Sequence, residues 1–575
     1  MLIAKIFIIL WLYHANVSHE KRDNELTTDL KSMTESSTAD MDRRSLLKLV
    51  GTTGIAASIA GCSDDDAGGD DDIAEPDAIS DTFVKAATQV YGDIDPAKQT
   101  DYTEAMATTN FYEPVVFVDS NREIAERMAV SWDLEEDGRT WVFELREGVP
   151  FHDGGEMTAE DVVYSLDRMM EIQQGYSSLW QGVYEAGNAE ARDEYTVAIE
   201  LNREFGPFLA TLVQMNVVDS QTVRENEVDG DMGQEYLNET TAGTGPYLLE
   251  EWSSGEEMIY ERFDDYWQGW EDGQIERVRT PIVEEDSTIV TMIQEGEVDM
   301  TSQFMGTDNY EAMAEMDHVR VPEESQWQLF HLPINASKPP TDDVHVRRAI
   351  AYAFNYDTAV NQIFRGGEVA QGPVPRGMPG HNDDVPVSEQ DMDAAQDELE
   401  QASYSVEEIN EIGLEHVYVA GDDLQEQIHL VLADSLSDLG IEIEGRSEQW
   451  ATITDIAGDS DETAHLTNIF RTATTPTPDG HTYQMFHPDE HGSYVAQTWH
   501  DNRELGDVLD RARTADTEEE RTEAYQEAQA MITEEQYSVF VANPPYRIAI
   551  SDRVDGWTYR GLLSFDFNWH DLTWQ

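Results

Sequence analysis

One segment constrains the fold of this chain more than any other, because it predicts a parallel β-sheet. Residues 416–420 have the pattern of a strand, and a second strand begins at 441–443 after Gly440. Between them, apolar residues recur on one helical face: Leu424, Ile428, Val431, Leu432, Leu436 and Leu439. A strand, a helix and a strand in this order indicate a βαβ unit and therefore an α/β protein.

Helix and strand patterns alternate along the rest of the chain. Trp141, Phe143 and Leu145 alternate with polar residues, which predicts a strand. Thr158 and Asp161 have the spacing of a capping box, which predicts a helix that begins there. Further helices are expected after Ser287 and Thr517 and around 346–354, and further strands at 298–300 and 537–542. A length of 575 residues suggests about two to four domains.

The charge of the chain excludes some partners. The sequence has 118 acidic residues against 35 basic ones, a formal net charge of -83. Nucleic acid and anionic membranes are recognised through basic surfaces, so neither is expected as the main partner. At about 1 M ionic strength the Debye length falls to roughly 3 Å, which would screen most of the self-repulsion. We therefore expect adaptation to very high salt, with binding of cations or basic ligands as the alternative.

The sequence contains no recognisable catalytic motif. It has no G-x-S-x-G, no H-E-x-x-H and no Walker-type loop, and its only cysteine is Cys62. We therefore expect that the protein is not an enzyme and that it binds no cofactor. The histidines His481, His487, His491 and His500 lie close together in the sequence. Pro488 and Gly492 favour solvated loop histidines there, and a metal or metal-chelate site stays open as the alternative.

The N-terminal region resembles an export and lipidation signal. Residues 41–48 read MDRRSLLK and resemble a twin-arginine signal, and residues 59–62 read IAGC and resemble a lipobox. The resemblance implies that Cys62 is lipidated and that residues 63–79, which begin with an Asp-rich run, tether the body to the membrane. We expect translation to start at Met41, which would make residues 1–40 a mis-called extension.

Five blocks in the body resemble the family 5 extracellular solute-binding proteins of ABC importers. Residues 132–154 read WDLEEDGRTWVFELREGVPFHDG and are followed by Thr158–Val162. The others are GTGPY at 243–247, YW at 266–267 leading to EGEVD at 295–299, DVHVRRAI at 343–350, and the strand region 439–450. The resemblance covers roughly residues 80–575.

The resemblance implies an α/β, two-lobed, periplasmic-binding-protein-like fold with an inserted subdomain in lobe I. Lobe I would comprise 80–120, 238–322 and 544–575, and the inserted subdomain 121–237. Lobe II would comprise 323–543, with strands that cross between the lobes as a hinge. A ligand would bind in the cleft between the lobes, and domain closure would enclose it.

The resemblance also implies candidate ligand-binding residues. In peptide-binding members, an aspartate in a Trp-x-x-Asp-Tyr-x-Asp-Pro stretch anchors the peptide amino terminus, and residues 470–479 align with that stretch. Thr474 takes the place of the aspartate, and a shifted alignment would put Asp479 there instead. The complete expected set is Tyr112, Glu113, Trp327, Trp450, Arg471, Thr474 and Asp479.

The sequence therefore predicts a monomeric, lipid-anchored, extracellular protein that captures a peptide or another small polar solute. It would deliver this solute to the permease and ATPase subunits of an ABC importer. No metal site is expected, and an oligosaccharide or a nickel chelate stays open as the ligand. The alternatives are a sensor ectodomain and an exported hydrolase on the same scaffold.

Overall fold

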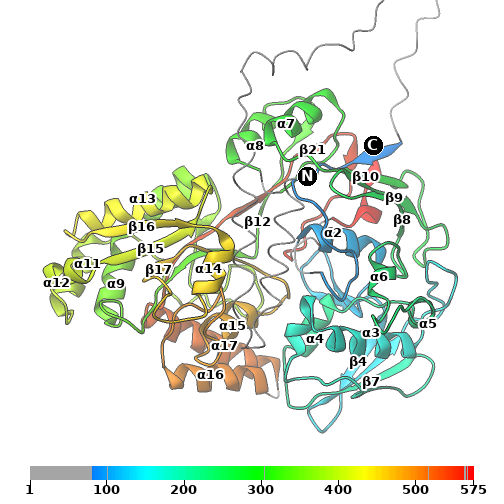
Figure 1. Cartoon of the computed structure of the whole chain (residues 1–575), viewed down its shortest axis with the longest axis horizontal. Helices are drawn as coiled ribbons and strands as arrows, with labels where there is room; N and C mark the ends of the chain where they lie inside the picture. The colour runs from blue at the N-terminus through cyan, green and yellow to red at the C-terminus, as the bar shows by residue number, and fades with distance from the viewer. Residues whose placement is uncertain (1–80, 100–101, 304, 516, 563–564, 566) are drawn as a thin grey trace, which may run out of the picture. The chain divides into compact units, whose positions relative to one another are not determined.

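The computed structural model describes residues 81–99, 102–303, 305–515, 517–562, 565 and 567–575. The predicted extension 1–40, the signal 41–62 with Cys62, and the tether 63–79 lie outside the described residues. The described elements gather around separate sheets, which we call the first lobe, the inserted subdomain and the second lobe (Figure 1). The exact domain boundaries given above stay predictions.

The first lobe is built on a four-stranded sheet in the order β1-β10-β9-β8. Strand β1 is parallel to β10, and the other pairs are antiparallel. A buried cluster around Phe111, Tyr260 and Trp569 forms its core. The strands are β1 (Thr82–Val84), β8 (Tyr247–Ser253), β9 (Glu257–Arg262) and β10 (Arg277–Pro281), and the longer helices are α2 (Tyr102–Phe111), α7 (Asp286–Glu295) and α8 (Thr307–Ala314).

The inserted subdomain is an antiparallel sheet in the order β4-β5-β7-β6, with helix α3 packed on it. Its buried cluster includes Phe143, Leu166 and Trp180, and it continues to Trp327 and Met378. The core of the subdomain is therefore shared with residues of the second lobe. The elements are β4 (Ala129–Leu134), β5 (Thr140–Leu145), β6 (Ala189–Ala191), β7 (Thr196–Glu200), α3 (Ala159–Ile172) and α4 (Phe208–Thr211).

The second lobe has two sheets. The parallel sheet β16-β15-β17 contains the predicted βαβ unit, in which α13 connects β15 to β16. The antiparallel sheet has the order β14-β19-β13-β18. The strands are β13 (Gln328–Pro333), β14 (Glu368–Val369), β15 (Leu414–Val419), β16 (Ile443–Glu448), β17 (Leu466–Thr467), β18 (Ile469–Thr472) and β19 (Ser538–Asn543). The longer helices are α9 (Val344–Ala353), α11 (Met392–Gln401), α13 (Asp423–Ser437), α16 (Arg503–Thr514) and α17 (Glu518–Glu534).

Two chain segments cross between the lobes and pair along their length. Strand β11 (Val319–Arg320) pairs with β21 (Ile550–Ser551), and β12 (Glu323–Ser325) pairs with β20 (Pro545–Arg547). Further along, β13 pairs with β19 inside the second lobe. Figure 1 shows β12 between the elements around α7 and α8 and those around β15 and β17. A narrow ladder of this kind can bend without disrupting either core, as a hinge requires.

Local sequence signals explain why several helices begin and end where they do. The Thr158 N–H donates to the Asp161 carboxylate at 2.8 Å at the start of α3, and the Thr517 side chain accepts from the Glu520 N–H before α17. Gly296 ends α7 in the left-handed region, at φ 77°. Two predictions are wrong in detail. Helix α7 begins at Asp286, before Ser287, and in 298–300 only Met300 pairs, through isolated bridges.

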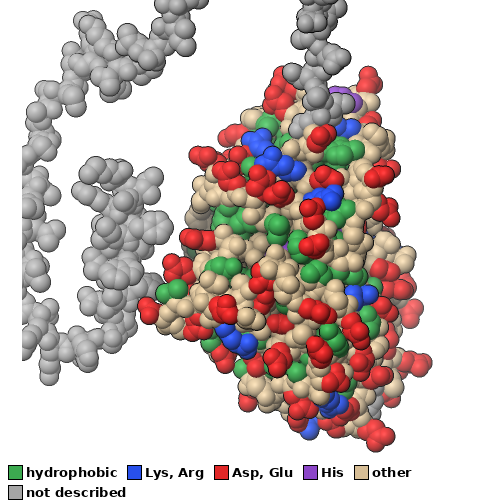
Figure 2. All heavy atoms as spheres, turned by 90° about the vertical axis from the view of Figure 1, so that its right-hand side faces the viewer, with side chains coloured by type: hydrophobic (Ala, Val, Ile, Leu, Met, Phe, Trp, Pro, Cys, Tyr) green, Lys and Arg blue, Asp and Glu red, His purple; other side chains and the backbone are tan. Residues whose placement is uncertain are grey.

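Acidic side chains are spread over the surface rather than gathered at one place. Figure 2 shows them over the whole visible face, with the few Lys and Arg side chains among them. Several arginines at the surface are paired with carboxylates, as in the pairs Arg262–Glu276 and Arg277–Glu250. Such exposed pairs contribute little to stability individually.

Candidate functional site

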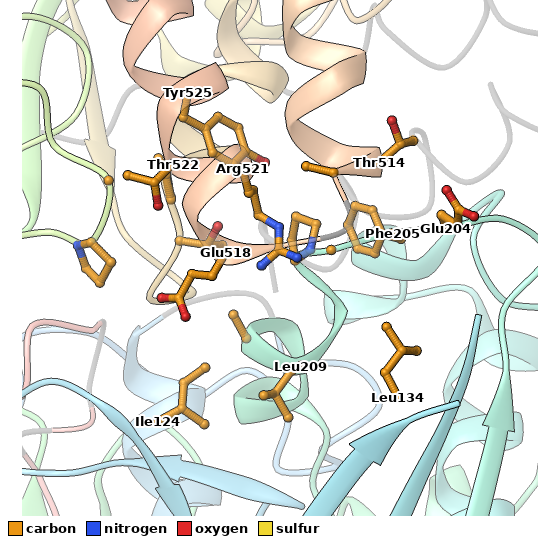
Figure 3. A pocket seen from close by; sticks show the side chains of 18 of the residues that line it. Ile124, Leu134, Glu204, Phe205, Leu209, Thr514, Glu518, Arg521, Thr522 and Tyr525 are labelled. Atoms are coloured by element: carbon orange, nitrogen blue, oxygen red, sulfur yellow. The ribbon is translucent and has the colours of Figure 1, made fainter. Parts of the chain in front are cut away.

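A cavity of about 500 Å³ lies between the inserted subdomain and the second lobe. The subdomain contributes the turn between β4 and β5, the loop before α4 with Phe205, and α4 itself with Leu209. The second lobe contributes the 476–478 segment and the first turns of α17, with Arg521 and Tyr525. Figure 3 shows α17 above this space and Leu209 below it. The two walls belong to different parts of the chain, whose buried cores meet at Trp327 and Met378.

Asp479 lies behind the wall of the cavity, with both carboxylate oxygens engaged. Arg513 donates to it from Nε and Nη2, both at 2.7 Å, and the Tyr525 hydroxyl donates at 2.9 Å. Burial, and next the charge of Asp479, raises the pKa of Tyr525 well above its usual value, so the hydroxyl stays a donor. The neighbouring Thr477 and Pro478 line the cavity. Asp479 thus holds the wall together through an internal ion pair.

Thr474 contacts the inserted subdomain through its backbone. Its carbonyl accepts a hydrogen bond from Gln214 Nε2 at 2.5 Å. A backbone–backbone hydrogen bond joins the Gly206 N–H to the Arg513 carbonyl at 2.7 Å. These bonds cross from the subdomain to the second lobe on either side of the 476–478 segment. The aligned anchor position thus carries a neutral side chain.

Glu113 is buried in a polar network of the first lobe. It accepts from the Tyr266 hydroxyl at 2.7 Å and from Trp267 Nε1 at 2.5 Å, and it pairs with Arg127 at 2.9 Å. Tyr112 beside it is fully buried in the first-lobe core. Burial is the main reason that the pKa of Tyr112 is raised. Both residues pack within the lobe and do not line the cavity.

The remaining predicted residues lie apart from one another. Trp327 is fully buried where the chain passes from β12 to β13, with Gly561 against its ring. Arg471 donates to the Gly480 carbonyl at 3.0 Å and to Gln484 at 2.6 Å. Trp450 is 45% exposed and stacks edge-on against Tyr494. The structure thus brings Arg471, Thr474 and Asp479 together on one segment and leaves Trp450 at the surface.

The prediction of solvated loop histidines is wrong. His481, His487 and His500 are buried, and His491 is half-buried. His481 ends a short helix (Pro478–His481), and α15 (Tyr483–Phe486) follows it. A loop begins at His487, as Pro488 and Gly492 indicate, but other parts of the second lobe cover it. Burial lowers the pKa of His500 to about 3 and that of His491 to about 4. In the part of the chain that the structure describes, no group of His, Cys, Asp or Glu has the geometry of a metal site.

The comparison with protein families gives a direct result. The model for bacterial extracellular solute-binding proteins, family 5 middle, matches residues 123–493. The chain belongs to this family. Family 5 proteins bind substrates and are not enzymes, and they have the two-lobed α/β fold with an inserted subdomain that the sequence predicted.

Individual family 5 relatives are distant but match over most of their length. A probable D,D-dipeptide-binding periplasmic protein of Escherichia coli is 26% identical over 83% of this chain and 91% of its own. Heme-binding protein A of Haemophilus influenzae is 24% identical over 89% of this chain and 97% of its own. The ABC transporter-associated periplasmic binding protein of Helicobacter pylori, solved with the peptide STSA, superimposes with a TM-score of 0.72. It is 23% identical and covers 86% of this chain and 98% of its own.

Sequence reasoning missed the residues on both walls of the cavity. Phe205 and Leu209 belong to the subdomain, whereas Arg521 and Tyr525 lie more than 300 residues later on α17. No motif links these positions, and only the fold brings them together. Among the described helices, none is both long enough and apolar enough to cross a lipid bilayer.

Proposed function

We propose that this family 5 protein captures a small solute in the cavity between the inserted subdomain and the second lobe, and delivers it to an ABC importer. The observation that carries the proposal is the cavity itself, whose walls belong to two parts of the chain joined by paired crossing strands. The relative from Helicobacter pylori, named as ABC transporter-associated, supports the assignment to transport. The protein would act as a monomer.

Closure supplies the signal to the transporter in this proposal. The bonds Gly206–Arg513 and Gln214–Thr474 cross from one wall to the other. Separating the walls would break both bonds, whereas a solute that contacts both walls would hold them together. A permease could then distinguish the loaded protein from the empty one by its closed form.

The residues at the aligned anchor position limit which classes of ligand this chain is expected to bind. Several relatives are named for dipeptides and one for heme. In this chain the aligned anchor is the neutral Thr474, and the Asp479 carboxylate is already bound by Arg513. A ligand ammonium would therefore find no free carboxylate at either position. The candidate ligands are peptides that do not depend on a contact between their ammonium group and a carboxylate, neutral oligosaccharides, and nickel chelates.

Calorimetry at high salt tests this proposal directly. The panel contains unblocked di- and tripeptides, neutral oligosaccharides and nickel chelates. We expect one class to bind, and unblocked small peptides to bind with a Kd poorer than about 10 μM, a free energy weaker than about −7 kcal/mol. Submicromolar binding of an unblocked peptide that is lost on N-acetylation would show that the chain does present an ammonium anchor.

Membrane attachment forms a separate part of the proposal. The signal at 41–48 and the IAGC end at 59–62 support lipidation of Cys62 and a place on the outer face of the cytoplasmic membrane. We expect Cys62→Ser to move the protein from the membrane fraction to the medium. Unchanged membrane association of this variant would contradict the anchor. The adaptation to very high salt also stays a prediction, carried by the net charge of -83.

A further inference from the structure

Arg521 reaches into the cavity from the second lobe. It lies in the second turn of α17, and Figure 3 shows its side chain directed away from the helix into the space above Leu209. Its guanidinium lies against the opposite wall. A Cβ atom added at Gly206 would be 2.2 Å from Arg521 Nε and 2.5 Å from Cζ. Any residue other than glycine at position 206 would therefore clash with the guanidinium in its present position.

The charge of Arg521 is not compensated within the described part of the chain. Its Nε is buried and has no hydrogen-bond partner there, and no described carboxylate forms an ion pair with it. Two arginines on the adjacent helix α16 behave differently, since Arg511 pairs with Glu527 and Arg513 pairs with Asp479. Acids outnumber bases by 118 to 35, so carboxylate partners are abundant. Its buried Nε thus lacks a partner among the described residues, and a carboxylate of a bound molecule could supply one.

The acidic side chains around the cavity do not take this role. Four glutamates contribute to its lining, and all four are exposed: Glu135, Glu136, Glu204 and Glu518. Exposed carboxylates act through water and salt, which weakens their effect on a charge inside the cavity. Phe205 and Leu209, in contrast, offer apolar surface beside Arg521. The lining of the cavity therefore combines one arginine with apolar side chains and with the hydroxyl groups of Thr477, Thr514 and Thr522.

We propose that Arg521 is the anchor for a carboxylate of the captured solute, and that the protein selects solutes with one carboxylate and an apolar portion. This inference rests on the proposed capture of a solute in the same cavity. A guanidinium binds a carboxylate through two parallel N–H donors, which fixes the orientation of the ligand. The apolar portion of the solute would lie on Phe205 and Leu209. Because Arg521 also touches Gly206, ligand binding at this position would couple directly to the contact between the two walls.

The test compares two probes that differ only in charge. N-acetyl-alanyl-phenylalanine and its C-terminal amide are titrated into the full chain at one fixed high KCl concentration. We expect the acid to bind the unchanged protein at least about tenfold more tightly than the amide. In Arg521→Gln this ratio should fall to about one, and in Arg521→Lys it should be intermediate. Arg511→Gln is the matched control, since Arg511 lies on the adjacent helix outside the cavity, and it should keep the full ratio.

Each other outcome decides against one of the two proposals. Equal affinity for acid and amide in the unchanged protein, or a preference that survives in Arg521→Gln, would overturn the role of Arg521. Binding of a neutral oligosaccharide but of neither probe would also overturn it and would leave solute capture intact. If no member of the panel binds and no solute can be extracted from the native protein, solute capture itself fails. Thermal unfolding shows whether each variant is folded. If Arg521→Gln is not folded, the acid-to-amide ratio of Arg521→Lys tests the role of Arg521.

Discussion

The first lobe with its inserted subdomain and the second lobe bury different kinds of polar side chain. The former buries arginine–carboxylate pairs, among them Arg168–Asp95 at 2.6 Å and Arg127–Glu113 at 2.9 Å. The latter buries histidines, and burial is the largest cause that lowers the pKa of His331, His416 and His500 to about 3. Among the described residues of the second lobe, Arg513 and Asp479 form a comparably buried ion pair at the wall of the cavity.

This difference means that acid should affect the two regions unequally. A buried histidine that stays neutral stabilises the fold fully above its unfolded pKa, near 6.5. Below that pH the unfolded chain binds a proton and the folded chain does not, so stability is lost as the pH falls toward the folded pKa. A buried ion pair between arginine and a carboxylate has no such dependence between pH 6.5 and 5 unless its carboxylate titrates there.

The largest expected effect is therefore a loss of second-lobe stability between pH 6.5 and 4.5. Each of the three histidines lowers the free energy of unfolding by about 1.4 kcal/mol per pH unit, or about 4 kcal/mol per unit together. In the first lobe and subdomain, burial lowers the pKa of His152 to about 4 and also lowers that of His570, and a smaller slope is expected from these two histidines. Hydrogen exchange at several pH values measures the loss of protection separately in the first lobe, the subdomain and the second lobe. Earlier loss of protection in the first lobe would contradict the comparison.

Arg168→Met should give the next largest loss of stability, in the first lobe and its inserted subdomain. Arg168 donates to Asp95 from Nη1 at 2.7 Å and from Nη2 at 2.6 Å, and both side chains are buried. Removing the cation leaves a buried carboxylate unpaired, which costs about 3–5 kcal/mol. Thermal unfolding measures the loss, and the double variant Arg168→Met with Asp95→Leu should recover much of it. A single variant as stable as the unchanged protein would show that the pair is not what holds α3 to the first lobe.

The local elements could be predicted from the sequence because their signals are local. The capping pair Thr158 and Asp161, the alternation at Trp141 and Phe143, and the 416–443 unit each lie within a short window. The cavity could not be predicted in this way. Gly206 and Arg521 touch across more than 300 residues of chain, and nothing near either residue indicates the other. The burial of the loop that begins at His487 could not be predicted either. Pro488 and Gly492 indicate a loop, but they do not indicate whether other elements bury it.

A smaller effect is expected from a single histidine of the second lobe. The His500 ring stacks on Tyr537 with ring centroids 4.0 Å apart, and its Nδ1 accepts a hydrogen bond from the Asn502 N–H at 3.2 Å. Phenylalanine preserves the stacking and removes the titrating group. His500→Phe should therefore reduce the pH slope of stability by about 1.4 kcal/mol per unit below pH 6.5. Chemical denaturation at pH 7.5 and 5.0 measures the slope, and an unchanged slope would exclude His500 as one of its sources.

The cavity between the subdomain and the second lobe is the proposed place of the solute, and a bulky side chain inside it tests this directly. Leu209 lines that cavity, whereas Leu430 on α13 is 58% exposed. Replacing either leucine by tryptophan adds the same volume, but only Leu209→Trp adds it inside the cavity. The measurement is the amount of solute released per protein by denaturing the natively purified chain, determined by mass spectrometry. If the solute binds in this cavity, Leu430→Trp will carry as much solute as the unchanged protein. Leu209→Trp will carry less than about a tenth, a change of about 1.4 kcal/mol or more at subsaturating ligand. Equal loading of Leu209→Trp and the unchanged protein would contradict it.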